Sequence, residues 1–345
     1  MGNTIVPPYL LLRIARLKDP RFAAAADAAR RSVLQDLPFR STRERLMGRM
    51  PAGAEKPSGL LRTIFDAGNA EKIPGREVRR EGGAATGDAA VNEAYDGLGS
   101  TDALFRSEFA RAGVDGENLP LLATVHYGSS YDNAFWDGGR LVFGDGDGQI
   151  FNRFTASLSV IGHELSHGVT QYTANLVYRG QSGALNESVS DVFGALVEQH
   201  AGNQTADSAS WLIGEGLFTD QVEGRALRSM SAPGTAYDDD VLGKDPQPAT
   251  MDDYVDTADD NGGVHLNSGI PNHAFFLAAS AIGGHAWERA GRIWYDTITG
   301  GGLAADSDFA GFAEAATAAA ASRYGADSVE QSAVAEAWHE VGVTP

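Results

Sequence analysis

Two histidines four residues apart constrain this chain more than any other feature of its sequence. They stand in the run His163-Glu164-Leu165-Ser166-His167, which follows a mostly apolar stretch and contains no proline. Residues spaced by four lie on one face of an α-helix, so both imidazoles can reach a single ion. Imidazole nitrogen is a ligand that suits zinc. Glu164, beside the first histidine, is placed to act as a general base on a metal-bound water.

An isolated run of this kind also fits the polar face of an ordinary helix, so a second pattern is needed. Asn186-Glu187-Ser188-Val189-Ser190-Asp191 supplies it, with Glu187 20 residues after His167. Glu187 and Asp191 are four apart and share a helix face. A catalytic zinc takes three protein ligands and keeps one open position. We therefore predict one zinc ion held by His163, His167 and Glu187, with Asp191 accepting the second ring N–H of a histidine ligand.

Together the two runs resemble the signature of the thermolysin-like zinc metallopeptidases, HExxH followed by NExxSD. The resemblance covers about residues 60–345 and includes three further stretches: Tyr131-Asp132-Asn133-Ala134-Phe135-Trp136, Arg228-Ser229-Met230-Ser231 and the run from Asp260 to Gly269. Within that family the chain is similar to the protealysin-like branch, which has a short N-terminal propeptide with a Pro-Pro element. Here that element is matched by Pro7, Pro8 and Tyr9.

The resemblance implies a role for each matching residue in peptide-bond hydrolysis. Glu164 is then the general base, and His265 and Tyr178 donate hydrogen bonds to the oxyanion of the tetrahedral intermediate, with Asp260 orienting His265. Asn186 and Asp191 are expected to lie next to the zinc ligands without binding the zinc themselves. The residues implied in substrate binding are Asn133, Ala134 and Arg228 for the main chain, and Phe151, Val160, Ile213 and Leu227 for the apolar pocket after the cleaved bond. The implied activity is a zinc-dependent neutral endopeptidase cleaving on the amino side of bulky hydrophobic residues.

Charge divides the chain into a basic leader and an acidic body. Residues 1–57 hold 11 Lys and Arg against 5 Asp and Glu, a net charge of +6, while the remainder has a net charge of −25. By composition alone, such a leader is a surface helix or a tail. With the resemblance, we predict that it is an inhibitory propeptide that covers the cleft, helped by opposite charge. A helix is expected over Ala23–Leu37, and cleavage within residues 48–59.

The fold class expected is α+β, with two catalytic lobes and the zinc cleft between them. Residues 58–157 form a β-rich lobe after the leader of residues 1–57, and residues 158–345 form a helical lobe. Short strands and turns are expected over most of residues 60–155, including strands at 121–127 and 140–143. The Ala-rich stretch 303–340 is expected to be helical. The two-lobed arrangement comes from the resemblance; the sequence pattern alone gives a β-rich part before an α-rich part.

Composition excludes several other functions. The chain has no cysteine, so it has neither disulfides nor Cys-ligated metals. A net charge of −19 disfavours nucleic acids and anionic membranes as partners, and no run of about 18 apolar residues predicts a membrane span. The expected partners are a peptide or protein substrate, the chain's own propeptide, and a proteinaceous inhibitor. No signal-peptide pattern is found, so we expect a cytoplasmic protein or unconventional export.

The resemblance also carries a departure that concerns calcium. At the positions of the family's double calcium site, Glu198 and Glu215 remain, whereas Ser159, Ser210 and Leu212 replace carboxylates. Losing three carboxylates removes most of the charge that a calcium pair needs, so we predict that the double site is absent. Two other functions stay open: a zinc-binding interaction protein without turnover, and a precursor whose leader is never removed.

Overall fold

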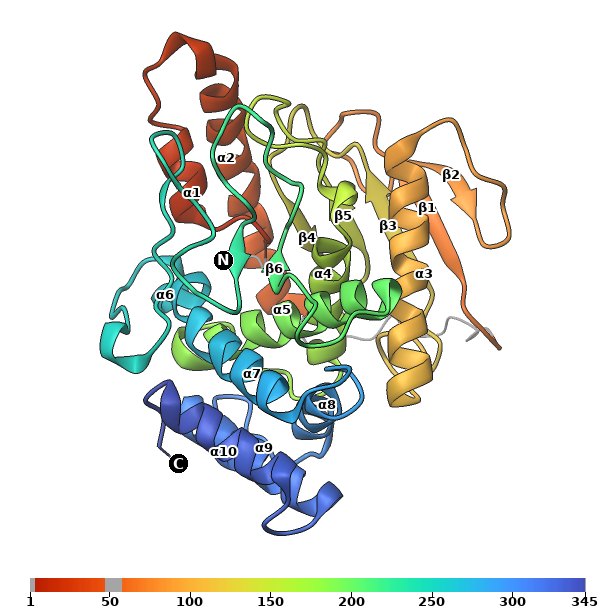
Figure 1. Ribbon diagram of the computed structural model, residues 1–345. Helices are drawn as coiled ribbons and strands as arrows, with labels where there is room; N and C mark the ends of the chain where they lie inside the picture. The colour runs from red at the N-terminus through yellow and green to blue at the C-terminus, as the bar shows by residue number, and fades with distance from the viewer. Residues whose placement is uncertain (1–3, 47–57, 345) are drawn as a thin grey trace.

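The computed structural model describes residues 4–46 and 58–344. Figure 1 shows a sheet with its covering helix on one side of the molecule and a group of helices on the other. The sheet has five strands in the order β2-β1-β3-β5-β4. Its strands are β1 (Arg62–Asp66), β2 (Arg76–Arg80), β3 (Leu121–Val125), β4 (Ala134–Trp136) and β5 (Leu141–Phe143). β1, β3 and β5 run parallel, while β2 and β4 are the antiparallel edges.

A long helix, α3 (Ala89–Phe109), lies where we expected strands and turns, so that part of the prediction is wrong. Asp88 caps it, because its carboxylate accepts the backbone N–H groups of Ala90 and Val91. The two glycines and the Ser-Thr-Asp run in this helix lower its intrinsic propensity, and packing outweighs that cost. A side chain at Gly97 would stand 2.4 Å from Ile161 Cδ1, so glycine here allows close helix packing.

The helical lobe is built around a tightly packed pair, α4 (Leu158–Gln171) and α5 (Gly180–Gly202). Glycine brings these helices together: a Cβ on Gly194 of α5 would stand 2.5 Å from the carbonyl oxygen of Ser159 on α4. The remaining elements are α6 (Asp260–Asn267), α7 (Gly269–Ile282), α8 (Ala290–Thr299), α9 (Phe309–Tyr324), α10 (Val329–Glu340), and the short hairpins β6 (Leu212–Ile213) with β7 (Arg228–Ser229) and β8 (Asp238–Asp239) with β9 (Gly243–Lys244). No helix in the described part of the chain has the length and apolarity to cross a bilayer.

The leader folds against both lobes (Figure 1). Its helices are α1 (Pro8–Ile14) and α2 (Ala23–Leu46), so α2 extends beyond the helix expected over Ala23–Leu37. Before α1 the chain is extended, and Thr4 forms an antiparallel bridge with Phe135 of the edge strand β4. Pro7 precedes α1 in an extended conformation and Pro8 opens the helix, as the fixed φ of proline favours. The predicted cleavage region, residues 48–59, lies almost entirely outside the described residues.

His126 joins the cap of α3 to the loop after β5. Its Nε2 lies 2.8 Å from Asp88 Oδ2, and its Nδ1 lies 2.9 Å from both carboxylate oxygens of Asp145. The hydrogen bond with Asp145 and that with Asp88 outweigh burial and raise the pKa of His126 to about 9. The folded state therefore binds a proton here more tightly than the unfolded chain does.

We predict that His126→Gln destabilises the protein in a pH-dependent way. Because the folded pKa is raised, the charged contacts stabilise fully below the unfolded value of about 6.5 and lose their effect as pH rises through about 9. Urea unfolding should show a loss of about 1–2 kcal/mol at pH 6 that shrinks by pH 10. His339→Gln, at an exposed histidine of α10, is the control. An equal loss at both pH values would contradict this role.

Candidate metal centre and substrate cleft

Three side chains from α4 and α5 converge on one point. The Nε2 atoms of His163 and His167 lie 3.0 Å apart. Glu187 approaches from α5, with Oε2 3.5 Å from His163 Nε2 and Oε1 3.4 Å from His167 Nε2. The three ligand atoms lie within 4.8 Å of one another, and in the described part of the chain no other group of three His, Cys, Asp or Glu residues meets this criterion.

This donor set fits zinc. Two imidazole nitrogens and one carboxylate are the three-ligand set of a catalytic zinc, which keeps its fourth position open. All three side chains are buried, and Glu187 Oε2 has no hydrogen-bond partner among the described residues. A buried carboxylate oxygen is costly unless it is paired or holds a metal. When bound, zinc supplies Lewis acidity and a water of lowered pKa.

A second layer of side chains orients the two histidines. His163 Nδ1 lies 2.8 Å from Asp191 Oδ1. His167 Nδ1 lies 2.9 Å from Asn186 Oδ1 and 2.9 Å from Ser190 Oγ. With Nδ1 donating to these acceptors, each ring leaves Nε2 for the metal. The structure thus brings Asn186 and Asp191 to the positions predicted for them and adds Ser190, which the same sequence run contains.

Asp191 is the centre of a larger buried network. Arg228 of β7 donates to both of its oxygens at 2.8 Å, and Asn272 of α7 donates to Oδ2 at 2.9 Å. Burial alone would raise the pKa of Asp191, but the Arg228 guanidinium and the hydrogen bond with His163 outweigh it and hold that pKa well below its usual range. No local sequence pattern marks Asn272, because it lies 81 residues from its partner Asp191.

His265 and Tyr178 both lie beside Glu187, one of the three predicted metal ligands. Asp260 accepts from His265 twice: Oδ1 lies 2.8 Å from Nδ1, and Oδ2 takes the backbone N–H at 2.9 Å. Asp260 adopts φ 50°, followed by three more residues with positive φ, and this left-handed start of α6 turns its carboxylate back onto the ring. Burial alone would lower the pKa of His265. The charges of Asp260 and Glu187 outweigh burial and raise this pKa to about 9. Tyr178 donates to Glu187 Oε1, and its hydroxyl lies 3.3 Å from His265 Nε2.

The residues predicted to bind substrate line the same cleft, and the leader's extended segment occupies it. Ile5 donates its backbone N–H to the carbonyl of Ala134 at 3.1 Å. Val6 donates its own to Asn133 Oδ1 at 2.9 Å. Arg228 Nη1 donates to the Ile5 carbonyl at 2.9 Å. The pocket residues are all buried in the cluster that also contains Ile5: Phe151, Val160, Ile213 and Leu227.

Sequence reasoning missed the side chains that fix the rest of the leader. Asp36 of α2 is buried and accepts from Tyr131 Oη at 2.5 Å and from Asn133 Nδ2 at 3.2 Å. Arg13 of α1 donates to the carbonyls of Asp240 and Val241 at 3.0 Å. These pairs are separated by 95 to 228 residues, so no local pattern could reveal them. Tyr9, from the Pro-Pro element, packs against the main core.

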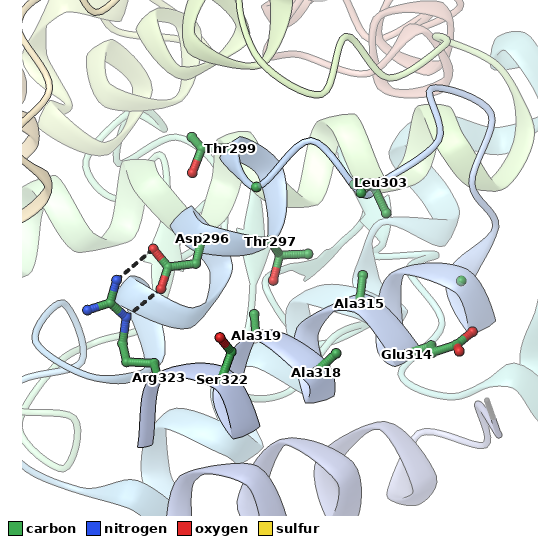
Figure 2. Close-up of a pocket in the computed structure, with 13 residues that line it drawn as sticks. Asp296, Thr297, Thr299, Leu303, Glu314, Ala315, Ala318, Ala319, Ser322 and Arg323 are labelled. Carbon is green, nitrogen blue, oxygen red and sulfur yellow. Dashed lines mark hydrogen bonds and ion pairs between the residues drawn. The ribbon is translucent and has the colours of Figure 1, made fainter. Parts of the chain in front are cut away.

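A large cavity of about 890 Å³ lies elsewhere, between α8 and α9. Figure 2 shows its wall of small side chains, with the Asp296–Arg323 ion pair at one end and Glu314 at the other. None of the predicted site residues lines it. Size alone therefore does not mark the candidate site, which the leader segment around Ile5 occupies.

Fold and site together define a two-lobed metallopeptidase. A family model described as the thermolysin metallopeptidase catalytic domain matches residues 55–171, and one described as its alpha-helical domain matches residues 174–343. The chain is 50% identical over 343 residues to an extracellular metalloprotease of Pectobacterium carotovorum subsp. carotovorum, covering 99% of this chain and 96% of that one. It is 41% identical over 266 residues to a thermolysin of Alicyclobacillus acidocaldarius subsp. acidocaldarius, covering 75% and 46%.

Among solved structures, the precursor of protealysin, a metalloproteinase from Serratia proteamaculans, matches with a TM-score of 0.89 and 50% identity. The match covers 99% of this chain and 100% of that one. This chain therefore belongs to the thermolysin metallopeptidase family and is a thermolysin-like metalloendopeptidase. The predicted family and fold class are confirmed. Both family models leave out residues 1–54. The residue roles, the domain limits, the inhibitor partner and the cellular location stay predictions.

We predict that Asp191→Asn weakens zinc binding by about 10- to 100-fold, because the variant lacks the charge that orients and polarises His163. Competition with a chromogenic chelator measures this affinity. Asp207→Asn, at a surface acid, is the matched control. Unchanged zinc affinity in a folded Asp191→Asn protein would contradict the positioning role of Asp191.

Proposed function

We propose that this protein is a zinc-dependent neutral endopeptidase that is made as a precursor inhibited by its own N-terminal segment. The observation that carries the proposal is the backbone pairing of Ile5 and Val6 with Asn133, Ala134 and Arg228. A peptide substrate needs these same main-chain partners. The leader, in residues 1–57, therefore covers a site that is already built to hold an extended peptide.

The proposed mechanism divides the work among side chains of the cleft. Asn133, Ala134 and Arg228 hold the peptide extended along the edge of β4, which is strand addition to an open sheet edge. Glu164, buried on α4 between the two histidine ligands, takes the proton of the attacking water and passes it to the leaving nitrogen. His265 and Tyr178 donate hydrogen bonds to the oxyanion, each worth a few kcal/mol in a preorganised site. Asp260 keeps the His265 ring in place.

Specificity follows from the pocket for the residue after the cleaved bond. Phe151, Val160, Ile213 and Leu227 are apolar and at most 1% exposed. Such a wall gains from burying a large apolar side chain and penalises a charged one. We expect Leu, Ile or Phe at this position of the substrate.

Inhibition by the leader rests on charge as well as on cleft contacts. The basic leader lies on an acidic body. Arg13 donates to the backbone carbonyl of Asp240 in the acidic segment of residues 238–240. Asp36 adds a buried anchor beside Asn133. Opposite charge speeds and orients such docking. Removal of the leader would then open the cleft to other peptides.

The proposed enzyme has no double calcium site. Ser159 is buried and its hydroxyl accepts the backbone N–H of Gly214 at 3.1 Å. Burial raises the pKa of Glu198, a hydrogen bond with Ser159 opposes that rise, and the nearby charge of Glu215 adds to it. Two carboxylates supply little of the charge that two calcium ions require.

We predict that Glu164→Gln lowers peptide hydrolysis by at least about 100-fold while keeping one zinc per chain, because only the general base is removed. A quenched peptide with Leu after the cleaved bond measures the rate in both proteins after maturation by the same added protease. Removal of zinc from the wild-type protein should abolish the rate as well. A Glu164→Gln enzyme with wild-type activity would contradict the mechanism.

We also predict that Ile5→Glu makes the uncleaved precursor at least about 10-fold more active than the wild-type precursor. Ile5 is fully buried, and an ionised carboxylate placed in an apolar pocket loses its hydration. Initial rates on the quenched peptide are compared while gels show intact chains. Leu12→Glu, at an exposed position of α1, is the control and should change the rate less than twofold. Equal rates for Ile5→Glu and wild type would contradict inhibition through the cleft.

A further inference from the structure

The leader segment lies in the cleft in one definite register. The carbonyl of Thr4 accepts from His265 Nε2 at 2.9 Å. The next residue, Ile5, pairs through its N–H with Ala134 and through its carbonyl with Arg228. Three consecutive backbone groups of the segment, the Thr4 carbonyl, the Ile5 N–H and the Ile5 carbonyl, thus each have a different partner in the cleft.

That register is the one a substrate needs. His265 is the proposed donor to the oxyanion, so the carbonyl it contacts is the carbonyl open to attack. This carbonyl belongs to Thr4. The residue after it, Ile5, is bulky, apolar and fully buried, and belongs to the same hydrophobic core as the pocket residues. The Thr4–Ile5 peptide bond therefore stands where the cleaved bond of a substrate would stand.

We propose that this bond is itself a substrate, and that the precursor hydrolyses its own Thr4–Ile5 bond within the same molecule. The inference rests on the proposed peptidase function. One water is consumed: its oxygen bonds to the Thr4 carbonyl carbon, and the bond from that carbon to the Ile5 nitrogen breaks. Glu164 carries the water's proton to the leaving nitrogen. The products are residues 1–4 ending in a carboxylate and a chain that begins with the Ile5 amine.

The chain that begins at Ile5 stays in the cleft after cleavage. The contacts that hold the leader lie on the Ile5 side of the bond: the Ile5 carbonyl on Arg228, the Val6 N–H on Asn133, and Arg13 on the acidic segment. Leu10 and Leu11 of α1 are also buried. On the other side, Thr4 contacts the rest of the protein through the bridge to Phe135 and the hydrogen bond to His265, while its hydroxyl donates to the Val6 carbonyl within the leader. Trimming at Ile5 therefore precedes leader removal and does not activate the enzyme.

The Pro-Pro element explains why the register does not slip. Helix α1 begins at Pro8, three residues after Ile5, and Pro7 has the extended conformation that its ring enforces. Pro7 and Pro8 have no N–H to pair with a cleft acceptor. Only the residues before them can lie along β4 as a substrate does.

Intact-mass measurement of the zinc-loaded precursor tests the proposal, with Glu164→Gln as the matched control. We expect wild-type protein to become a chain of residues 5–345 at a rate that does not change on dilution, because bond and site share one molecule. Glu164→Gln should keep Met1, or Gly2 if the host removes the initiator. A chain starting at Ile5 in both proteins would mean trimming by the host and would overturn the proposal.

A parallel assay of the matured wild-type enzyme on the quenched peptide separates this inference from the proposed function. Peptide hydrolysis together with a precursor that keeps residues 1–4 overturns self-cleavage and leaves the peptidase function standing. A precursor cut at another bond of the segment overturns the register. If neither the peptide nor the Thr4–Ile5 bond is cleaved, both proposals fail.

Discussion

The buried carboxylate of Asp191 is the interaction on which the rest of the site depends. It contacts His163 on α4, Arg228 on β7 and Asn272 on α7, so one side chain links three elements of the helical lobe. A buried charge of this kind is tolerated only when it is fully paired. Because Arg228 also contacts the Ile5 carbonyl, the same carboxylate orients a predicted metal ligand and a main-chain contact of the peptide. Metal binding and peptide binding therefore share one rigid support.

The open edge of the sheet is the second feature that determines how the cleft holds a peptide. A strand edge presents unpaired N–H and C=O groups that recruit another chain. Here β4 is that edge, and the leader segment around Thr4 and Ile5 covers it in the precursor. The feature that makes the cleft able to bind peptides is thus the one that the leader conceals. In this account inhibition and recognition use the same hydrogen bonds.

The sequence predicts the parts of the site that are local. His163 and His167 are four residues apart, as are Glu187 and Asp191, so each pair lies on one helix face. Helix periodicity therefore predicts the metal centre from the sequence pattern itself. Arg228 and Asn133 needed the family resemblance, because nothing near them in the chain marks their role. Helix α3 was missed since packing overrides its weak propensity.

The parts that could not be predicted depend on distant pairings. Asp36 lies on a helix with no distinguishing pattern, and its partners stand 95 and 97 residues away. The register of Thr4 against His265 spans 261 residues and is visible only in three dimensions. Family resemblance indicated that a leader covers the cleft, but not which of its bonds meets the oxyanion donor.

The most direct test of this account is anomalous diffraction at the zinc edge from crystals of the zinc-loaded Glu164→Gln precursor. We expect one strong peak bounded by His163, His167 and Glu187, with density for Thr4 to Val6 along β4 and the Thr4 carbonyl beside His265. A zinc peak away from these three ligands, or a cleft without the leader segment, would contradict it.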